Sequence, residues 1–155
     1  MIPLIYLLVA AVHGQQQTYV SVPTSQGTVQ GKTVNYGSDT NQLYYGQADV
    51  FLGIPYAQPP TGDLRFQAPQ AMRSYPQQVY DATYYRPKCP QLNGGNYVNE
   101  DCLYLNVFTQ QANGTQAMAV MVFVDGGDGL TSGGTDQSQM KVQRGRDSTM
   151  NSVER

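Results

Sequence analysis

Histidine, tryptophan and charged residues are the scarcest features of this chain. Its 155 residues include one His and no Trp, and only 13% are charged, for a formal net charge of -2. Proteins that bind nucleic acid concentrate Lys and Arg on one face, so the composition excludes that class of partner. The sequence also lacks an apolar run of the ~18 residues that a membrane-spanning helix needs, so we expect no membrane span.

The single histidine, His13, lies at the end of an apolar N-terminal segment. Residues 2–12 are nearly all apolar, and small side chains occupy the positions that a signal peptidase reads. We therefore expect residues 1–14 to be a signal peptide cleaved after Gly14 and the mature chain to be secreted; a buried N-terminal helix or strand is the alternative. Cleavage would remove the imidazole, a frequent general base and metal ligand.

Short β-prone runs separated by turns follow this segment. Residues 19–22 and 28–34, joined by Ser25-Gln26-Gly27, predict a hairpin. Residues 48–56 predict the next strand, whose apolar run ends at Pro55 because proline cannot donate to a ladder.

The middle of the chain is rich in proline and then returns to a strand pattern. Residues 56–90 contain too many prolines to form a long helix. Residues 100–109 alternate in a way typical of a strand. Asn113-Gly114-Thr115 reads either as an N-glycosylation sequon on an exposed turn or as plain turn residues.

The candidate site is a glycine-rich turn that follows an apolar run. Residues 117–124 are all apolar and predict a strand buried on both faces. Ligands of open α/β sheets bind beyond the carboxyl ends of such strands, so Gly126, Gly127 and Gly129 are where chemistry is expected.

Other functions of a glycine-rich loop do not fit the residues in this turn. A dinucleotide-binding fingerprint would need Gly or Ala in place of Ser132, and a P-loop would need Lys in place of Thr135. The spacing of Asp125, Asp128 and Asp136 does not match an EF-hand calcium loop. We therefore expect no cofactor and no metal site.

Six motifs follow one another along the chain: FLGIPYA at 51–57, PPTG at 59–62, LRF at 64–66, DAT at 81–83, CPQ at 89–91 and EDCLYLNVF at 100–108. Together they resemble the type-B carboxylesterase family, which includes cholinesterases and non-catalytic adhesion proteins of the neuroligin and glutactin-like kind. The resemblance covers about residues 18–134 and corresponds only to the N-terminal portion of the family's domain.

The resemblance implies an α/β fold class and a domain organisation. The fold would be an incomplete α/β-hydrolase fold, mostly its N-terminal antiparallel strands plus the strand leading to the oxyanion loop. Residues 15–134 would be the N-terminal part of the domain, and residues 135–155 a polar, disordered tail. A functional basic tail is the alternative for the last segment.

The resemblance also implies two structural pairs. Cys89 and Cys102 match the family's first disulfide, as expected of a secreted chain, with two free thiols as the alternative. Arg65 and Glu100 match a buried ion pair whose role in the family is structural.

The departures from the family pattern concern catalysis. The run 117–124 matches the strand that leads into His-Gly-Gly-Gly, where backbone N–H groups form part of the oxyanion hole. Here Asp125 replaces the histidine and Asp128 interrupts the glycines, leaving Gly126, Gly127 and Gly129 as a remnant of the oxyanion loop. No Gly-x-Ser-x-Gly motif occurs, so no catalytic residue is carried over.

Three functions remain open. The first, which we favour, is a truncated carboxylesterase-like protein that is inactive as this chain. The second is a secreted binding or adhesion module with a protein partner. The third is a piece of an active esterase, which would require a downstream Gly-Glu-Ser-x-Gly.

Overall fold

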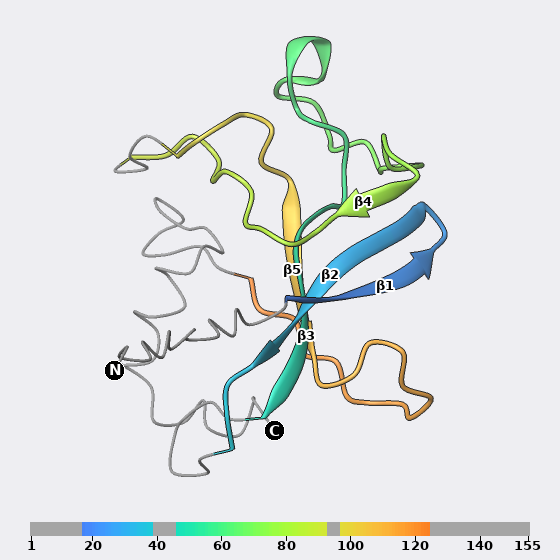
Figure 1. The fold of residues 1–155 in the computed structure, drawn as a ribbon. Coiled ribbons are helices and arrows are strands. Elements are labelled where there is room, and N and C mark those ends of the chain that lie inside the picture. The colour runs from blue at the N-terminus through green and yellow to red at the C-terminus, as the bar shows by residue number, and fades with distance from the viewer. Residues whose placement is uncertain (1–16, 39–45, 93–96, 125–155) are drawn as a thin grey trace, which may run out of the picture.

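The computed structural model describes residues 17–38, 46–92 and 97–124. Its elements are β1 (Thr18–Thr24), β2 (Gly27–Asn35), β3 (Gln47–Pro55), the 3-10 turn η1 (Gly62–Leu64), β4 (Val79–Asp81) and β5 (Tyr104–Thr109). The strands form one sheet in the order β1-β2-β3-β5, and the short β4 pairs parallel to β2 (Figure 1). This is the largely antiparallel sheet, poor in helices, that the resemblance implied. Within the described ranges, no helix is long and apolar enough to cross a membrane.

The predicted hairpin forms between β1 and β2. Thr24 pairs with Gly27, so Ser25 and Gln26 make the turn, and the Thr24 hydroxyl oxygen accepts the Gln26 N–H at 3.2 Å. Gly27 adopts a φ of 135°, a conformation that side chains disfavour. The local pattern of β-prone runs around a short polar turn was sufficient to predict this element.

β3 is the buried centre of the sheet. Val50, Phe51 and Leu52 are each no more than 4% exposed. Phe51 packs with Val29, Tyr80 and Ala82 in the hydrophobic core, so β2, β3 and β4 all contribute to it. The continuous apolar run in the sequence reflects burial of β3 on both faces.

Gly53 lies at a bulge in the middle of the β3–β5 pair. Phe51 pairs with Val107 and Ile54 with Leu105, so β3 carries one residue more than β5 between these positions. Gly53 has a φ of 71°, and its N–H donates to the side-chain oxygen of Asn106 at 2.7 Å. An interior glycine is a known mark of a bulge, and here it lets β3 turn its next residues toward the loop that follows.

β5 is shorter than the strand predicted over residues 100–109. It begins at Tyr104, because the preceding residues form a corner that includes the disulfide cysteine Cys102. The strand predicted over residues 100–109 therefore lacks its first four residues, 100–103, which do not pair with β3.

The strand predicted over residues 117–124 is wrong for this structure. These residues have no strand assignment and are exposed, with Val120 at 88% and Val124 at 83%. A strand needs a neighbour to satisfy its N–H and C=O groups, and no described strand pairs with this segment. The apolar pattern indicates that the segment could form a buried strand, but it does so only where a partner strand supplies the hydrogen bonds.

Candidate functional site

The glycine-rich turn predicted to hold the chemistry lies outside the described residues. This applies to Gly126, Gly127 and Gly129, to both neighbouring aspartates, and to His13. The described side chains that bear on function are therefore those around β3, β4, β5 and the loops between them.

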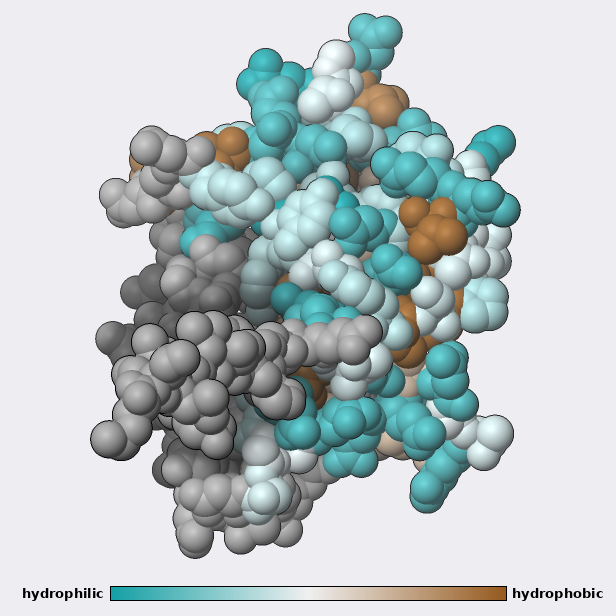
Figure 2. Space-filling model, in the orientation of Figure 1, coloured by the Kyte–Doolittle hydropathy of each residue, from teal (hydrophilic) through white to brown (hydrophobic). Residues whose placement is uncertain are grey.

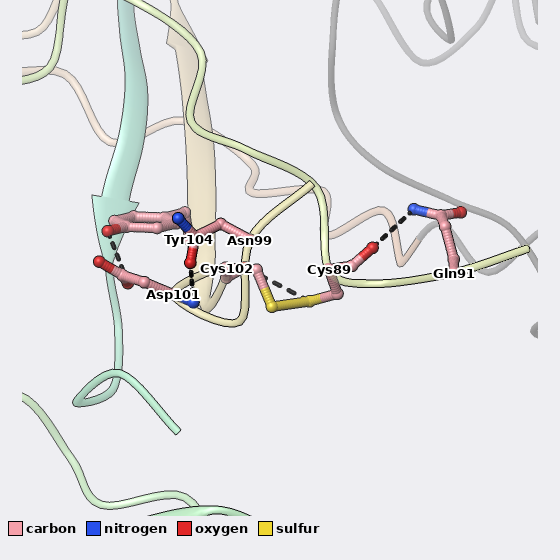
Figure 3. The surroundings of a disulfide bond; sticks show 6 residues. All are labelled: Cys89, Gln91, Asn99, Asp101, Cys102 and Tyr104. Carbon is pink, nitrogen blue, oxygen red and sulfur yellow. Dashed lines mark hydrogen bonds between the residues drawn. A yellow bond between two sulfur atoms is a disulfide. The ribbon is translucent and has the colours of Figure 1, made fainter. Parts of the chain in front are cut away.

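The disulfide joins Cys89 to Cys102 across the loop that precedes β5 (Figure 3). The two Cα atoms lie 5.0 Å apart. Backbone bonds from Lys88 N to Tyr97 O and from Asn99 N to Lys88 O close the same loop beside it. Both described cysteines are in this bond, which fixes the corner from which β5 starts.

Arg65 and Glu100 form an ion pair, but the pair is not buried. Nη2 of Arg65 lies 2.6 Å from Oε1 of Glu100, and the two side chains are 56% and 38% exposed. The expectation of a buried pair was wrong, since both side chains reach solvent, as does the neighbouring Phe66, which is 93% exposed. An exposed ion pair contributes ~0–1 kcal/mol to stability, so this one orients a loop more than it holds the fold.

Asn113 lies on a loop that a buried carboxylate attaches to the sheet. Asp49 of β3 is 7% exposed. Its Oδ1 accepts from the Thr33 hydroxyl at 2.7 Å and its Oδ2 from the Ala112 N–H at 2.9 Å. Asn113, next along the chain, is exposed. Asp49 therefore holds this turn at the surface with Asn113 facing solvent.

A cluster of one arginine and three tyrosines lies beside Gly53. The Arg86 guanidinium carbon is 4.1 Å from the ring centroid of Tyr84, 5.2 Å from that of Tyr80 and 5.9 Å from that of Tyr104. The guanidinium also donates to the Tyr84 hydroxyl and to the Asp81 carbonyl oxygen at 2.8 Å. Arg86 Nε is buried with no hydrogen-bond partner among the described residues, so the rings hold much of this cation.

Two phenols of this cluster, those of Tyr80 and Tyr104, hold their protons tightly. Burial raises the pKa of Tyr80 above its ordinary value of 10.0, partly opposed by the charge of Arg86. Burial, together with the hydrogen bond to Asp101 and its negative charge, raises the pKa of Tyr104 well above the same value. Both phenols are therefore neutral hydrogen-bond donors over the physiological range.

A pocket of about 290 Å³ opens between the segment after β3 and the start of β5. Its walls are mainly apolar and include Met72, Tyr75, Tyr80 and Tyr104. Asp101 is the one carboxylate among its lining residues. The Tyr104 hydroxyl donates to Oδ1 of Asp101 at 2.7 Å (Figure 3).

The described side chains do not form a hydrolytic constellation. Among the described residues, the hydrogen bond that a serine hydroxyl donates is the one from Ser25 to the side-chain oxygen of Gln26. No serine in these ranges donates to a carboxylate. No group of three His, Cys, Asp or Glu side chains that could hold a metal occurs among these residues. The described surface is mostly hydrophilic on the face shown in Figure 2, with small apolar patches.

Sequence reasoning missed Gly53, Asp49 and Arg86. A glycine inside an otherwise apolar strand was an available sign of the bulge. The contacts of Asp49 and Arg86 join residues distant in the chain, and nothing in the local pattern pointed to them.

The comparisons with known proteins agree on one family. The model of the Carboxylesterase family matches residues 18–144. Carboxylesterase 1D of Rattus norvegicus is 37% identical over 150 residues, which cover 85% of this chain and 26% of that protein. Acetylcholinesterase of Bungarus fasciatus is 34% identical over 122 residues, covering 70% of this chain and 19% of that protein.

The solved structure of a PNB esterase is 34% identical to the chain, with a TM-score of 0.44, over 59% of this chain and 18% of that one. The chain spans about a quarter of the length of the curated relatives, 26% in the case of Carboxylesterase 1D.

Proposed function

Because this chain belongs to the carboxylesterase family, we propose that residues 1–155 are a carboxylesterase-like chain that does not by itself hydrolyse esters. The observation that carries the proposal is the lack of a nucleophile motif within these residues. The sequence contains no Gly-x-Ser-x-Gly, the motif that presents the serine of α/β-hydrolases. Its only histidine, His13, lies in the segment that we expect to be removed as a signal peptide.

The charges expected beside the oxyanion loop point the same way. Gly126, Gly127 and Gly129 retain backbone donors, but Asp125 precedes them and Asp128 lies among them. An oxyanion hole stabilises a developing negative charge, and ionised carboxylates beside it oppose that charge. The remnant is therefore unsuited to acyl transfer even where its donors persist.

Ester hydrolysis by the secreted protein tests this proposal. The full chain is expressed through a secretory pathway and assayed on a chromogenic short-chain ester beside an active carboxylesterase. We expect no turnover above the uncatalysed rate. Turnover that scales with protein concentration and is lost in Ser132→Ala, the serine nearest to the missing motif, would overturn the proposal.

Secretion and glycosylation are part of the same proposal. Asn113 is exposed on its loop and precedes Gly114-Thr115, which supports a glycan at this position. Glycosidase treatment of secreted protein should increase its gel mobility, and Asn113→Gln should have the mobility of the treated protein. An N-terminus that retains Met1, or a mobility that does not respond to glycosidase, would contradict the corresponding part.

A second candidate function is a non-catalytic binding module. It is favoured by the exposure of the apolar segment 117–124, where Val122 is 80% exposed and Phe123 53%. An uncharged, exposed apolar segment of this kind is suited to pairing with a strand of another chain. A partner from culture medium that the wild type retains and Val122→Lys does not would support this function. Equal retention by both proteins would count against it.

A further inference from the structure

The pocket beside Asp101 has the composition of a binding site for a small amphiphilic molecule. Its volume of about 290 Å³ is just below the ~300–1,000 Å³ typical of ligand pockets. A ligand with a single ring fits this volume, whereas a long acyl chain does not. The apolar walls and one carboxylate indicate an apolar body with one polar end.

Two of the tyrosines that line the pocket, Tyr80 and Tyr104, have hydroxyls that already donate within the protein. The Tyr80 hydroxyl donates to the Gly53 carbonyl oxygen at 2.8 Å, and that of Tyr104 donates to Asp101. The rings of Tyr75 and Tyr80 lie with centroids 5.0 Å apart and planes tilted by 33°. Tyr80 and Tyr104 therefore offer a ligand mainly aromatic surface.

Asp101 retains an unused acceptor on this apolar wall. Its Oδ1 accepts the Tyr104 hydroxyl, and its backbone N–H donates to the Asn99 side chain at 3.0 Å. Its Oδ2 has no hydrogen-bond or ion-pair partner among the described residues. The ion pair found in these ranges joins Arg65 to Glu100 and does not involve Asp101. A carboxylate oxygen without a cation in an aromatic pocket favours a ligand that brings one.

Arg86 determines which contact would hold that cation. Its guanidinium lies 5.2 Å and 5.9 Å from the centroids of Tyr80 and Tyr104, and Arg86 is not among the residues that line the pocket. A positive charge already on these rings weakens their attraction for a second cation. The carboxylate of Asp101 is therefore the group that would hold the charge, and the rings would contact the apolar body.

We propose that this pocket binds a small organic cation, a primary ammonium joined by a short chain to one aromatic ring. The ammonium donates to Oδ2 of Asp101, and the ring packs against Tyr75 and Met72. The inference is independent of whether the chain hydrolyses esters, because it uses none of the residues of the oxyanion loop.

An NMR titration of the full, disulfide-bonded chain tests this site. The probes are phenethylammonium, the neutral 2-phenylethanol and the anionic 3-phenylpropionate. We expect saturable shifts in residues 72–80 and 101–104, with phenethylammonium binding at least about tenfold more tightly than the alcohol, and the anion most weakly. Added salt should weaken the binding of the ammonium and leave that of the alcohol unchanged.

Two variants assign the selectivity to one carboxylate. Asp101→Asn retains an oxygen for the Tyr104 hydroxyl and removes the charge. The ammonium and the alcohol should therefore bind this variant with about equal affinity. Asp63→Asn makes the same charge change at an exposed position and should leave the preference intact. Equal affinities of the wild type for all probes, no saturable shift, or an undiminished preference in Asp101→Asn would overturn the proposal. The ranking in the wild type decides the matter even if Asp101→Asn does not fold.

Discussion

Gly53 and Arg86 are in such close contact that a single added carbon would make them collide. A Cβ placed on Gly53 would meet Cγ of Arg86 well inside van der Waals distance. The carbonyl oxygen of Gly53 also accepts the Tyr80 hydroxyl, and Tyr80 lies under the same guanidinium. The bulge of β3 and the aromatic cluster therefore depend on the absence of a side chain at residue 53.

Replacing Gly53 by Ala should destabilise the protein by about 3 kcal/mol, through the cost of a positive φ and the displacement of Arg86. Gly37→Ala is the matched control, because Gly37 has a φ of 86° and no atom within 4 Å of the added Cβ. This control should cost only about 1 kcal/mol. Urea denaturation of both variants measures the difference, and equal losses would contradict the role of the Arg86 contact.

Raising the pH above 10 should weaken the fold. The folded state raises the pKa of Tyr80 and Tyr104 above 10.0, so at alkaline pH the unfolded chain loses phenolic protons that the folded chain retains. The stabilisation is present below pH 10 and is lost as the pH rises through the folded-state pKa values. The urea midpoint should therefore fall between about pH 9 and pH 11.

The variant Tyr104→Phe shows whether this phenol causes the pH dependence. Its urea midpoint should vary less with pH than that of the wild type. Tyr19→Phe changes a phenol that is 56% exposed and serves as the control. A pH dependence that is the same in the wild type and Tyr104→Phe would rule out Tyr104 as its source.

Removing the Asp49 carboxylate should cost about 1–3 kcal/mol, because Asp49→Ala leaves the Ala112 N–H and the Thr33 hydroxyl without their acceptor. Asp63→Ala removes the same charge from an exposed position and should change the free energy of unfolding by less than about 0.5 kcal/mol. Chemical denaturation compares the two. Faster amide exchange at Ala112 in Asp49→Ala alone would locate the effect in the loop that carries Asn113.

Removing Arg65 should have little effect. The ion pair with Glu100 is exposed, so Arg65→Ala should lower the free energy of unfolding by less than about 1 kcal/mol and leave the secreted yield unchanged. Thermal unfolding and quantitation of secreted protein measure the two quantities. A large fall in either would mean that the pair is buried in the protein as it is secreted.

The strands that were predicted correctly have sequence patterns whose pairing partner or boundary lies nearby in the chain. The hairpin of β1 and β2 follows from two β-prone runs and the turn at Ser25-Gln26, and β3 from a continuous apolar run ending at Pro55. Residues 117–124 have an equally strong pattern and form no strand. The difference is that a hairpin supplies its own partner, whereas an isolated strand depends on residues elsewhere.

The sequence by itself determined the family, the hairpin, the buried strand β3 and the pairing of Cys89 with Cys102, because these follow from local pattern and from motifs in order. Only the tertiary structure decided that the Arg65–Glu100 pair is exposed and that Arg86 lies against three tyrosine rings. The same holds for Asp49, whose carboxylate reaches Ala112, 63 residues away. The physical reason is that burial and long-range contacts depend on which segments pack together in the folded chain. Periodicity along the sequence does not specify which distant segments come into contact.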